Sequence, residues 1–173
     1  NVSENNATNI TVANVAVSSS KGTICTWLGP ASNLGHSTIV PKREKFGEHK
    51  KEVNVEADTL DGIVGKEVLL KSRLVKIDIE GSERLAIEGV HDLLAQFDDF
   101  TEWVVELSSE FSPEGQEDVS YVFDVFADAG YKAYKIQTSG LPVSGLDPLT
   151  NAPQDRLCDV LFTKRSFGAG SDL

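Results

Sequence analysis

The chain runs Val75-Lys76-Ile77-Asp78-Ile79-Glu80-Gly81-Ser82-Glu83 near its middle, and this stretch decides the fold. An apolar strand ends in it, a turn rich in carboxylates follows, and Ser82 then caps the start of a helix. Ligands in open α/β sheets lie just beyond the carboxyl ends of strands. The acids of this turn, Asp78 and Glu80, are therefore the first candidate site residues.

Strand and helix patterns alternate along the rest of the chain. Strands are expected at residues 10–17, 23–28, 37–40, 51–57, 73–79, 103–107, 131–136 and 158–163. The first of these has the composition of a strand buried on both faces. The alternation predicts an α/β fold, with a mostly parallel sheet in a single domain over residues 1–173. The last two strands have no helix between them, and we expect an antiparallel pair at one edge, joined by a loop at 138–153.

Three helical segments are expected between the strands. The first starts at Asp58 or Thr59, either of which can cap it. A longer helix follows Ser82, and Gly89 is a point where it can break into two pieces. Its apolar face consists of Ala86, Val90, Leu93, Leu94 and Phe97. The third helix covers residues 119–129 and ends at Gly130 as a C-cap.

Composition limits the kinds of partner. The net charge of −11 over 173 residues argues against nucleic acid and anionic membranes, which both require a basic surface. The sequence contains no run of about 18 apolar residues, so we expect no membrane span. Cys25 and Cys158 are too few for a disulfide framework or a zinc site, and we expect buried free thiols. His49 and His91 fit no metal-ligand spacing, so no metal is assigned.

The N-terminal segment bears on the compartment. The sequence begins with Asn1 and contains no methionine, which indicates a processed, excised or incompletely recorded protein. No basic and then apolar leader opens it. The N-glycosylation acceptor pattern occurs at Asn1-Val2-Ser3, Asn6-Ala7-Thr8 and Asn9-Ile10-Thr11. We expect a cytoplasmic protein, with the secretory lumen as the alternative that these three sites leave open.

Four elements, taken in order, resemble the FkbM family of S-adenosylmethionine-dependent methyltransferases. The most specific is Lys76-Ile77-Asp78-Ile79-Glu80-Gly81 with Glu83 and Gly89, which is similar to the family signature. The others are residues 14–18 with Lys21-Gly22, then Thr59-Leu60-Asp61, and then Trp103-Val104-Val105-Glu106. The resemblance covers about residues 9–165. It implies the Rossmann-like sheet of a class I methyltransferase.

The sequence departs from this family at its beginning. Such enzymes normally start with a strand, a glycine-rich turn and a second strand that ends in an acid, and these hold the cofactor. No glycine-rich turn follows a strand near the N-terminus here. We therefore interpret the chain as the C-terminal two-thirds of the domain, apparently truncated at its N-terminal side. An incomplete sheet would leave apolar edges unpaired, which predicts a covering segment or a homodimer.

The resemblance implies roles for four candidate catalytic residues. Asp78 or Glu80 is expected to orient or deprotonate the acceptor, while the other caps the helix or pairs with Lys76. Glu106 ends a buried strand on the same rim of the sheet and is expected to line the pocket. His36 lies in a flexible loop that is able to close over the substrate.

The resemblance also implies residues that contact the cofactor. Asn14, Val15 and Ala16 lie at the end of the early strand, where related folds contact the adenine edge, and a plain core strand is the alternative. Gly81 provides the backbone freedom that the turn and the cofactor require.

The activity that the resemblance implies is methyl transfer from S-adenosylmethionine to a hydroxyl of a sugar or small metabolite. A non-catalytic fragment or interaction module, which pairs through its open sheet edge, is the alternative from a different class. A Rossmann-like enzyme that binds a metal through its carboxylates is a third and weaker possibility.

Overall fold

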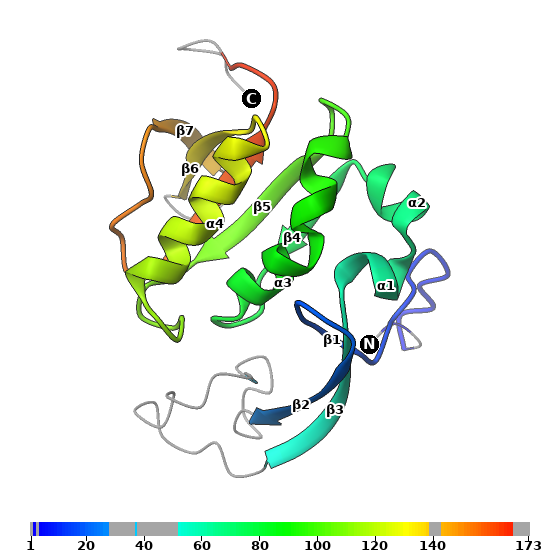
Figure 1. Ribbon diagram of the computed structural model, residues 1–173. Helices are drawn as coiled ribbons and strands as arrows, with labels where there is room; N and C mark the ends of the chain where they lie inside the picture. The colour runs from blue at the N-terminus through cyan, green and yellow to red at the C-terminus, as the bar shows by residue number, and fades with distance from the viewer. Residues whose placement is uncertain (1, 3, 28–36, 38–51, 139–142, 168–173) are drawn as a thin grey trace.

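The computed structural model describes residues 2, 4–27, 37, 52–138 and 143–167, which form two sheets and a layer of helices (Figure 1). The expected strand at 37–40 lies outside the described residues except for Ser37, and His36 lies outside them altogether.

The larger sheet has five strands in the order β4-β5-β8-β6-β7. Their bounds are β4 (Leu74–Ile77), β5 (Glu102–Leu107), β6 (Lys132–Thr138), β7 (Val143–Leu149) and β8 (Cys158–Thr163). Only the β4–β5 pairing is parallel, and the pairings β5–β8, β8–β6 and β6–β7 are antiparallel. The mixed α/β class is thus confirmed, whereas the mostly parallel sheet was wrong. Short connections between the last three strands leave no room for the crossovers that parallel pairing requires.

The C-terminal strands are arranged differently from the expected edge pair. β6 and β8 are antiparallel neighbours as expected, but β8 lies inside the sheet between β5 and β6. The edge is formed by β7, which falls in a segment that was expected to be a loop. The strand is hard to predict because it contains Gly145 and Pro148. Both residue types are rare in central strands but are tolerated in an edge strand.

The smaller sheet has three strands in the order β1-β3-β2. They are β1 (Ala16–Val17), β2 (Gly22–Trp27) and β3 (Glu52–Asp58), with β1 parallel and β2 antiparallel to β3. The expected buried strand at 10–17 is therefore wrong for most of its length. Ile10 and Val12 are 52% and 71% exposed, because in the described structure only the last two residues of this segment pair with a neighbouring strand.

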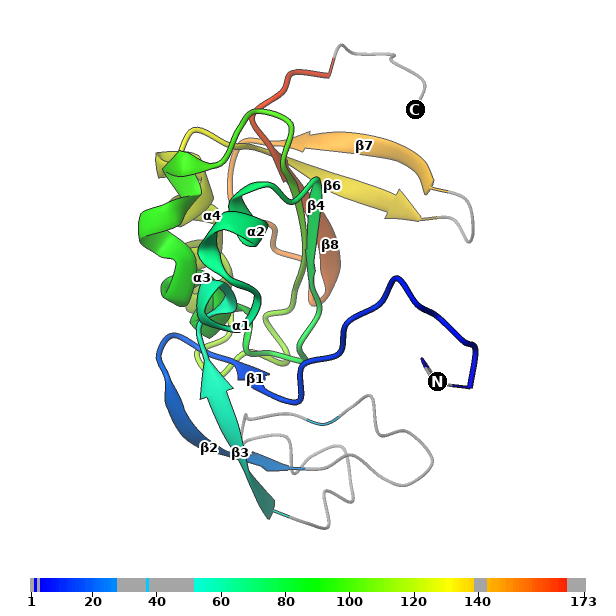
Figure 2. The ribbon, with the colours of Figure 1, turned by 90° about the vertical axis from the view of Figure 1, so that its right-hand side faces the viewer.

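The helices lie together on one face of the five-stranded sheet (Figure 2). They are α1 (Leu60–Val64), α2 (Lys66–Leu70), α3 (Glu83–Val90), the 3₁₀ helix η3 (His91–Gln96) and α4 (Gln116–Asp128). The alternation of buried and part-exposed residues along β5 matches this arrangement: Trp103, Val105 and Leu107 are buried. The residues between them, Val104 and Glu106, point to the opposite face.

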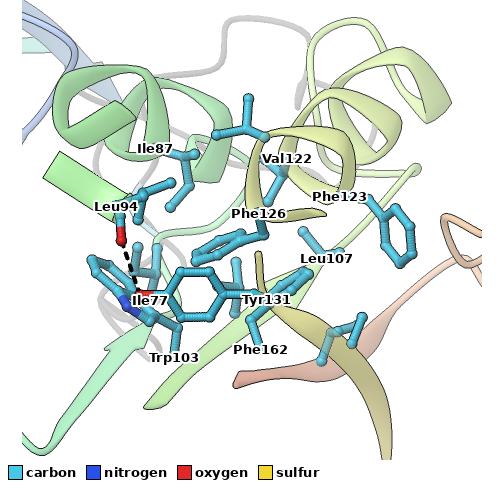
Figure 3. Close-up of a cluster of buried hydrophobic side chains, with 14 of the residues drawn as sticks. Ile77, Ile87, Leu94, Trp103, Leu107, Val122, Phe123, Phe126, Tyr131 and Phe162 are labelled. Carbon is cyan, nitrogen blue, oxygen red and sulfur yellow. Dashed lines mark hydrogen bonds between the residues drawn. The ribbon is translucent and has the colours of Figure 1, made fainter. Parts of the chain in front are cut away.

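Trp103 lies at the centre of the core between the sheet and the helices (Figure 3). Its ring packs edge-on against Phe97 and Phe126, with centroids 5.1 and 5.6 Å away. Phe126 in turn stacks on Phe162 of β8 at 4.1 Å. Edge-on and stacked aromatic pairs add to the free energy gained by burying the rings. This cluster fixes α4 and η3 on the sheet.

The helix ends follow the sequence in two of three cases. Thr59 is the N-cap of α1, and its Oγ1 accepts a hydrogen bond from the Gly62 amide at 3.2 Å. At the end of α4, Gly130 has φ +85°, and the amide of Tyr131 donates to the Phe126 carbonyl at 3.0 Å. This is the Schellman arrangement that glycine favours. Ser82 stands at the N-cap of α3 but makes no capping hydrogen bond, so that expectation was wrong.

The long helix does divide, but not at Gly89. The α-helical part ends at Val90 and continues as η3, while Gly89 is the point where α3 approaches the segment after β1. A Cβ atom at Gly89 would lie 2.6 Å from the Ser18 carbonyl oxygen and 3.3 Å from Thr59 Cγ2. The glycine therefore serves close packing between α3 and the smaller sheet.

Two negative findings hold for the described part of the chain. Cys25 and Cys158 are both free, as the sequence predicted, but only Cys158 is buried and Cys25 is half-buried. None of the helices described is long and apolar enough to cross a membrane.

Replacing Gly89 by alanine tests the contact between α3 and Ser18. Alanine favours a helix over glycine, yet we expect Gly89→Ala to lower the free energy of unfolding by about 1–3 kcal/mol, because a backbone carbonyl occupies the space. Urea denaturation measures this. Gly22→Ala is the control, since nothing lies within 4 Å of a Cβ there. Equal stability of the two variants would contradict the close approach.

Candidate functional site

The turn after β4 is held by a buried carboxylate from the next helix. Oε1 of Glu83 accepts hydrogen bonds from the amides of Ile79 and Gly81, both at 3.1 Å. Burial raises the pKa of Glu83, while these backbone donors act in the opposite direction. Glu83 thus binds amides of the turn that precedes α3. The Ser82 hydroxyl is buried and has no hydrogen-bond partner among the described residues.

Two residues of this turn have left-handed backbone. Gly81 has φ +98° and Glu80 has φ +60°. A non-glycine residue in that region is uncommon, and it costs of the order of 1 kcal/mol or more unless the surroundings enforce it. The hydrogen bonds from the Ile79 and Gly81 amides to Glu83 stabilise this backbone conformation. The Glu80 side chain is therefore held at the rim of the sheet.

Gly81 also allows two loops to meet. A Cβ atom at this position would overlap the backbone carbonyl of Phe111, in the loop that follows β5. The loops after β4 and β5 are therefore packed directly against each other at the carboxyl ends of the two parallel strands. The glycine therefore serves this contact between the two loops.

Asp78 is paired with a lysine of its own strand. Lys76 Nζ lies 2.7 Å from Asp78 Oδ2, and this hydrogen bond is the main cause of the raised pKa of Lys76. Residues two apart in extended backbone point to the same side, which brings these two together. The expectation that one of the two acids would pair with Lys76 is confirmed, with Asp78 as that acid.

Glu106 is the carboxylate with the most altered titration. It lies on β5, on the face away from the helices, and is half-buried. Burial, and then the negative charges of Asp78, Asp159, Glu80 and Glu83, raise its pKa to about 7. Among the described residues, no hydrogen bond or ion pair to a cation involves its side chain. A carboxyl group with this pKa is able to exchange a proton near neutral pH.

The structure brings together half of the residues that the sequence pointed to. Asp78, Glu80, Gly81 and Glu106 meet at the carboxyl ends of β4 and β5. Asn14, Val15 and Ala16 lie instead at the start of the smaller sheet, with Asn14 exposed and the other two half-buried. His36 falls outside the described residues, so its role stays a prediction.

Sequence reasoning missed one acid and misjudged another. Asp159 is the direct cross-strand neighbour of Glu106 on β8. Asp159 is the one charged residue of an otherwise apolar strand, and this was a signal in the sequence that it could be a site residue. The register that places it opposite Glu106 is decided only by the tertiary structure. Glu83 was noted only as part of a family signature, although its place one residue after a helix cap favours bonds to backbone amides.

A pocket of about 320 Å³ adjoins the acidic turn, between the first turns of α3 and α4. It is lined by Gly81, Ser82, Arg84, Leu85, Pro113, Glu114 and Asp118. Arg84 donates to Glu88 at 2.8 Å and to Asp118 at 2.9 Å, and its guanidinium lies 4.5 Å from the ring centre of Tyr121. These contacts join α3 to α4 and fix the wall of the pocket.

No metal site is formed by the residues that the structure describes. No group of three His, Cys, Asp or Glu side chains among them is arranged to hold a metal ion.

Comparison with known proteins identifies the family. The model of the methyltransferase FkbM domain matches residues 1–133. The chain belongs to the FkbM methyltransferase family. The match includes the whole acidic turn and β5, but it ends earlier than the resemblance over residues 9–165 suggested, so β7 and β8 lie beyond it.

One solved structure is similar, a methyltransferase FkbM from Methylobacillus flagellatus KT. The alignment has 16% sequence identity and a TM-score of 0.48, and covers 94% of this chain and 31% of that one. The chain thus spans about a third of that protein's length, and the family assignment rests on the sequence match. No curated protein matches the chain significantly.

The FkbM methyltransferase family generally uses S-adenosylmethionine. Gly81 borders the pocket beside the acidic turn, although the Phe111 carbonyl occupies the place of a Cβ atom there. Asn14 is exposed and lies two residues before β1. The sequence has no glycine-rich turn after its early strands.

Gly81→Ala tests the contact between the two loops. Gly65 is the matched control, because it also has positive φ (+88°) but has nothing within 4 Å of a Cβ atom. Both variants lose stability from the backbone conformation, and we expect Gly81→Ala to lose about 1–3 kcal/mol more from the overlap with Phe111. Thermal and urea unfolding of the two variants measure the difference. An equal loss in both would show that the loops are not in contact.

Glu106→Gln tests the raised pKa through protein stability. A carboxyl whose pKa is raised to about 7 in the folded state stabilises the fold while protonated, and this contribution is lost as pH rises from the ordinary range through 7. Glutamine cannot ionise. The quantity to compare is the unfolding free energy of the variant minus that of the wild type. We expect this difference to be larger at pH 8 than at pH 5 by roughly 1–2 kcal/mol, after discounting for solvent screening.

The control for this comparison is Glu110→Gln, which removes the same charge from an exposed position. We expect its stability difference from the wild type to change little over the same pH range. A Glu106→Gln variant with no pH-dependent gain would mean that Glu106 titrates normally.

Proposed function

We propose that this chain takes part in the methylation of a hydroxyl group on a sugar or small metabolite, with S-adenosylmethionine as the methyl donor. Membership of the FkbM methyltransferase family supports methyl transfer as the reaction class. It does not favour the alternative of a non-catalytic interaction module.

The observation that carries the proposal of a hydroxyl acceptor is the state of Glu106. A hydroxyl that receives a methyl group must lose its proton, and a nearby base speeds that loss. Glu106 is half-buried, has no cation partner among the described residues, and has a pKa of about 7. Asp78 is less suited to this role, since its carboxylate is already bound to Lys76 at 2.7 Å.

The remaining acids position the acceptor. Glu80 is held at the rim by its left-handed backbone and by the bonds from Ile79 and Gly81 to Glu83. Asp78 and Glu80 present oxygens that accept hydrogen bonds, which suits a molecule with several hydroxyl groups. We include His36, Asn14, Val15 and Ala16 in the proposal as groups that complete the site from the N-terminal part of the chain.

The donor supplies the methyl group when it is bound. The part of the reaction that this chain's own residues perform is removal of the proton, from the hydroxyl oxygen of the acceptor to an Oε atom of Glu106. Because only the ionised carboxylate accepts a proton, we expect turnover to rise with pH through about 7 and to level off above it.

A second segment or a second copy completes the sheet in this proposal. Among the described strands, β4 pairs only with β5, and Leu74 at its start is 58% exposed. An unpaired edge of this kind is normally covered by another strand or by a partner. We propose that such a strand also contributes backbone amides to the donor site.

The first test is a calorimetric titration of S-adenosylhomocysteine into the 173-residue chain, at a protein concentration where its oligomeric state has been determined. Micromolar binding supports the proposed donor. No binding by the folded chain would contradict a donor site in the chain as it stands, and would return the interaction module as the working hypothesis.

The second test concerns the base. In methyl-transfer assays against a panel of sugars and hydroxylated metabolites, we expect Glu106→Gln to lower turnover at least about tenfold while S-adenosylhomocysteine binding is retained. Asp124→Asn, on the exposed side of α4, removes the same charge far from the rim and is the control. Unchanged turnover in Glu106→Gln would remove Glu106 from the reaction.

A further inference from the structure

Two carboxylates face each other across the middle of the larger sheet. Glu106 of β5 and Asp159 of β8 are direct partners in the antiparallel register, between the pairs Val105–Val160 and Leu107–Cys158. Side chains in such positions have Cβ atoms about 4.5–5.5 Å apart. Both side chains are half-buried, and both lie on the face that the helices do not cover.

Neither acid of this pair forms a direct ion pair with a cation in the described structure. Lys76 of β4 is bound to Asp78 at 2.7 Å, and the charges of Asp159 and Glu106 also raise its pKa, so Lys76 acts on both acids from a greater distance. Glu80 and Glu83 of the turn add negative charge. On β6, next to β8, Lys135 is bound to Asp155 at 2.7 Å and lies opposite Val160, whose side chain points to the helix layer. Asp159, like Glu106, forms no side-chain hydrogen bond or ion pair among the described residues.

This arrangement has a structural cost that an ordinary strand would avoid. Like charges directly opposite each other destabilise a sheet, and β8 is otherwise apolar on both faces apart from Thr163. Within the part of the chain that the structure describes, neither acid caps a helix or bonds to a backbone amide. A threonine or valine at position 159 would satisfy the strand equally well, so packing does not explain the aspartate.

We propose that Asp159 is a positioning residue whose negative charge, directly across the strands from Glu106, helps to decide when Glu106 is able to accept a proton from the acceptor hydroxyl. This inference builds on the proposed function for its catalytic meaning, but the coupling between the two carboxyl groups does not depend on it. Two close carboxylates cannot both ionise freely, so they lose their protons in two separated steps.

The surroundings of Glu106 act in the same direction as Asp159. Besides burial, the negative charges of Asp78, Asp159, Glu80 and Glu83 raise the pKa of Glu106. An ionised carboxylate directly across the strands favours the protonated form of Glu106, and Glu106 must lose that proton before it takes one from a substrate.

The experiment is an NMR titration of the side-chain carboxyl carbons in the wild type, Asp159→Asn and Asp124→Asn. We expect the Glu106 midpoint to fall by roughly half a unit or more in Asp159→Asn, because one adjacent negative charge is lost. In Asp124→Asn, which loses a charge on exposed helix surface, we expect no change. A Glu106 midpoint that is the same in Asp159→Asn and in the wild type would overturn the proposal.

A measurement on the wild type decides the matter if Asp159→Asn does not fold. Coupled carboxyls sense each other, so the Asp159 resonance must show a second inflection at the midpoint of Glu106. A single inflection at Asp159 would overturn the proposal without any variant. Neither titration requires a methyl donor, so a failure to bind S-adenosylhomocysteine would reject the proposed function and would not affect the coupling between Asp159 and Glu106.

The consequence for catalysis has its own readout. If Asp159 controls the proton on Glu106, the acid limb of the pH–turnover profile moves to lower pH in Asp159→Asn. A residue that only supports the strand would lower turnover at all pH values without moving that limb. If the pH–turnover profile and the NMR midpoint of Glu106 move by the same amount, the proposal is supported. If the NMR midpoint moves and the pH–turnover profile does not, Glu106 is not the base.

Discussion

The interaction on which the rest of the site depends is the pair of hydrogen bonds from the Ile79 and Gly81 amides to the Glu83 carboxylate. These bonds turn the chain sharply from β4 into α3 and hold Glu80 in left-handed backbone. Because Gly81 has no side chain, the Phe111 carbonyl packs against it and draws the loop after β5 to the same rim. One buried acid and one glycine thereby bring two strand ends into a single site.

The core and the site use opposite faces of the same strand. On β5, Trp103, Val105 and Leu107 pack under the helices, while Glu106 lies on the other face with Asp159 opposite. A rigid aromatic core therefore determines where Glu106 lies, although it does not touch its carboxylate. The acids on the uncovered face oppose stability near neutral pH, and sites that cost stability in this way are typical of functional residues.

The local features of this chain were readable from its residues. The strand before Asp78, the caps at Thr59 and Gly130, the apolar face of α3 and the acids at the ends of β4 and β5 each depend on residues close in sequence. Apart from the cap expected at Ser82, the wrong expectations concern the pairing of strands. Residues 10–15 have strand composition but lack a partner in the described structure, and β7 has poor strand composition but completes an edge. Strand propensity reflects packing against neighbours more than the backbone itself.

By itself, the sequence determined the family, the acidic turn and its glycine, because a turn and a helix start are decided by a few consecutive residues. Only the tertiary structure decided that Glu83 holds the turn, that β8 enters between β5 and β6, and that Asp159 faces Glu106. Residues 106 and 159 are far apart in the chain, and their register is set by packing Val105, Val160 and the aromatic rings into one core. The proton chemistry of the site is a product of that packing.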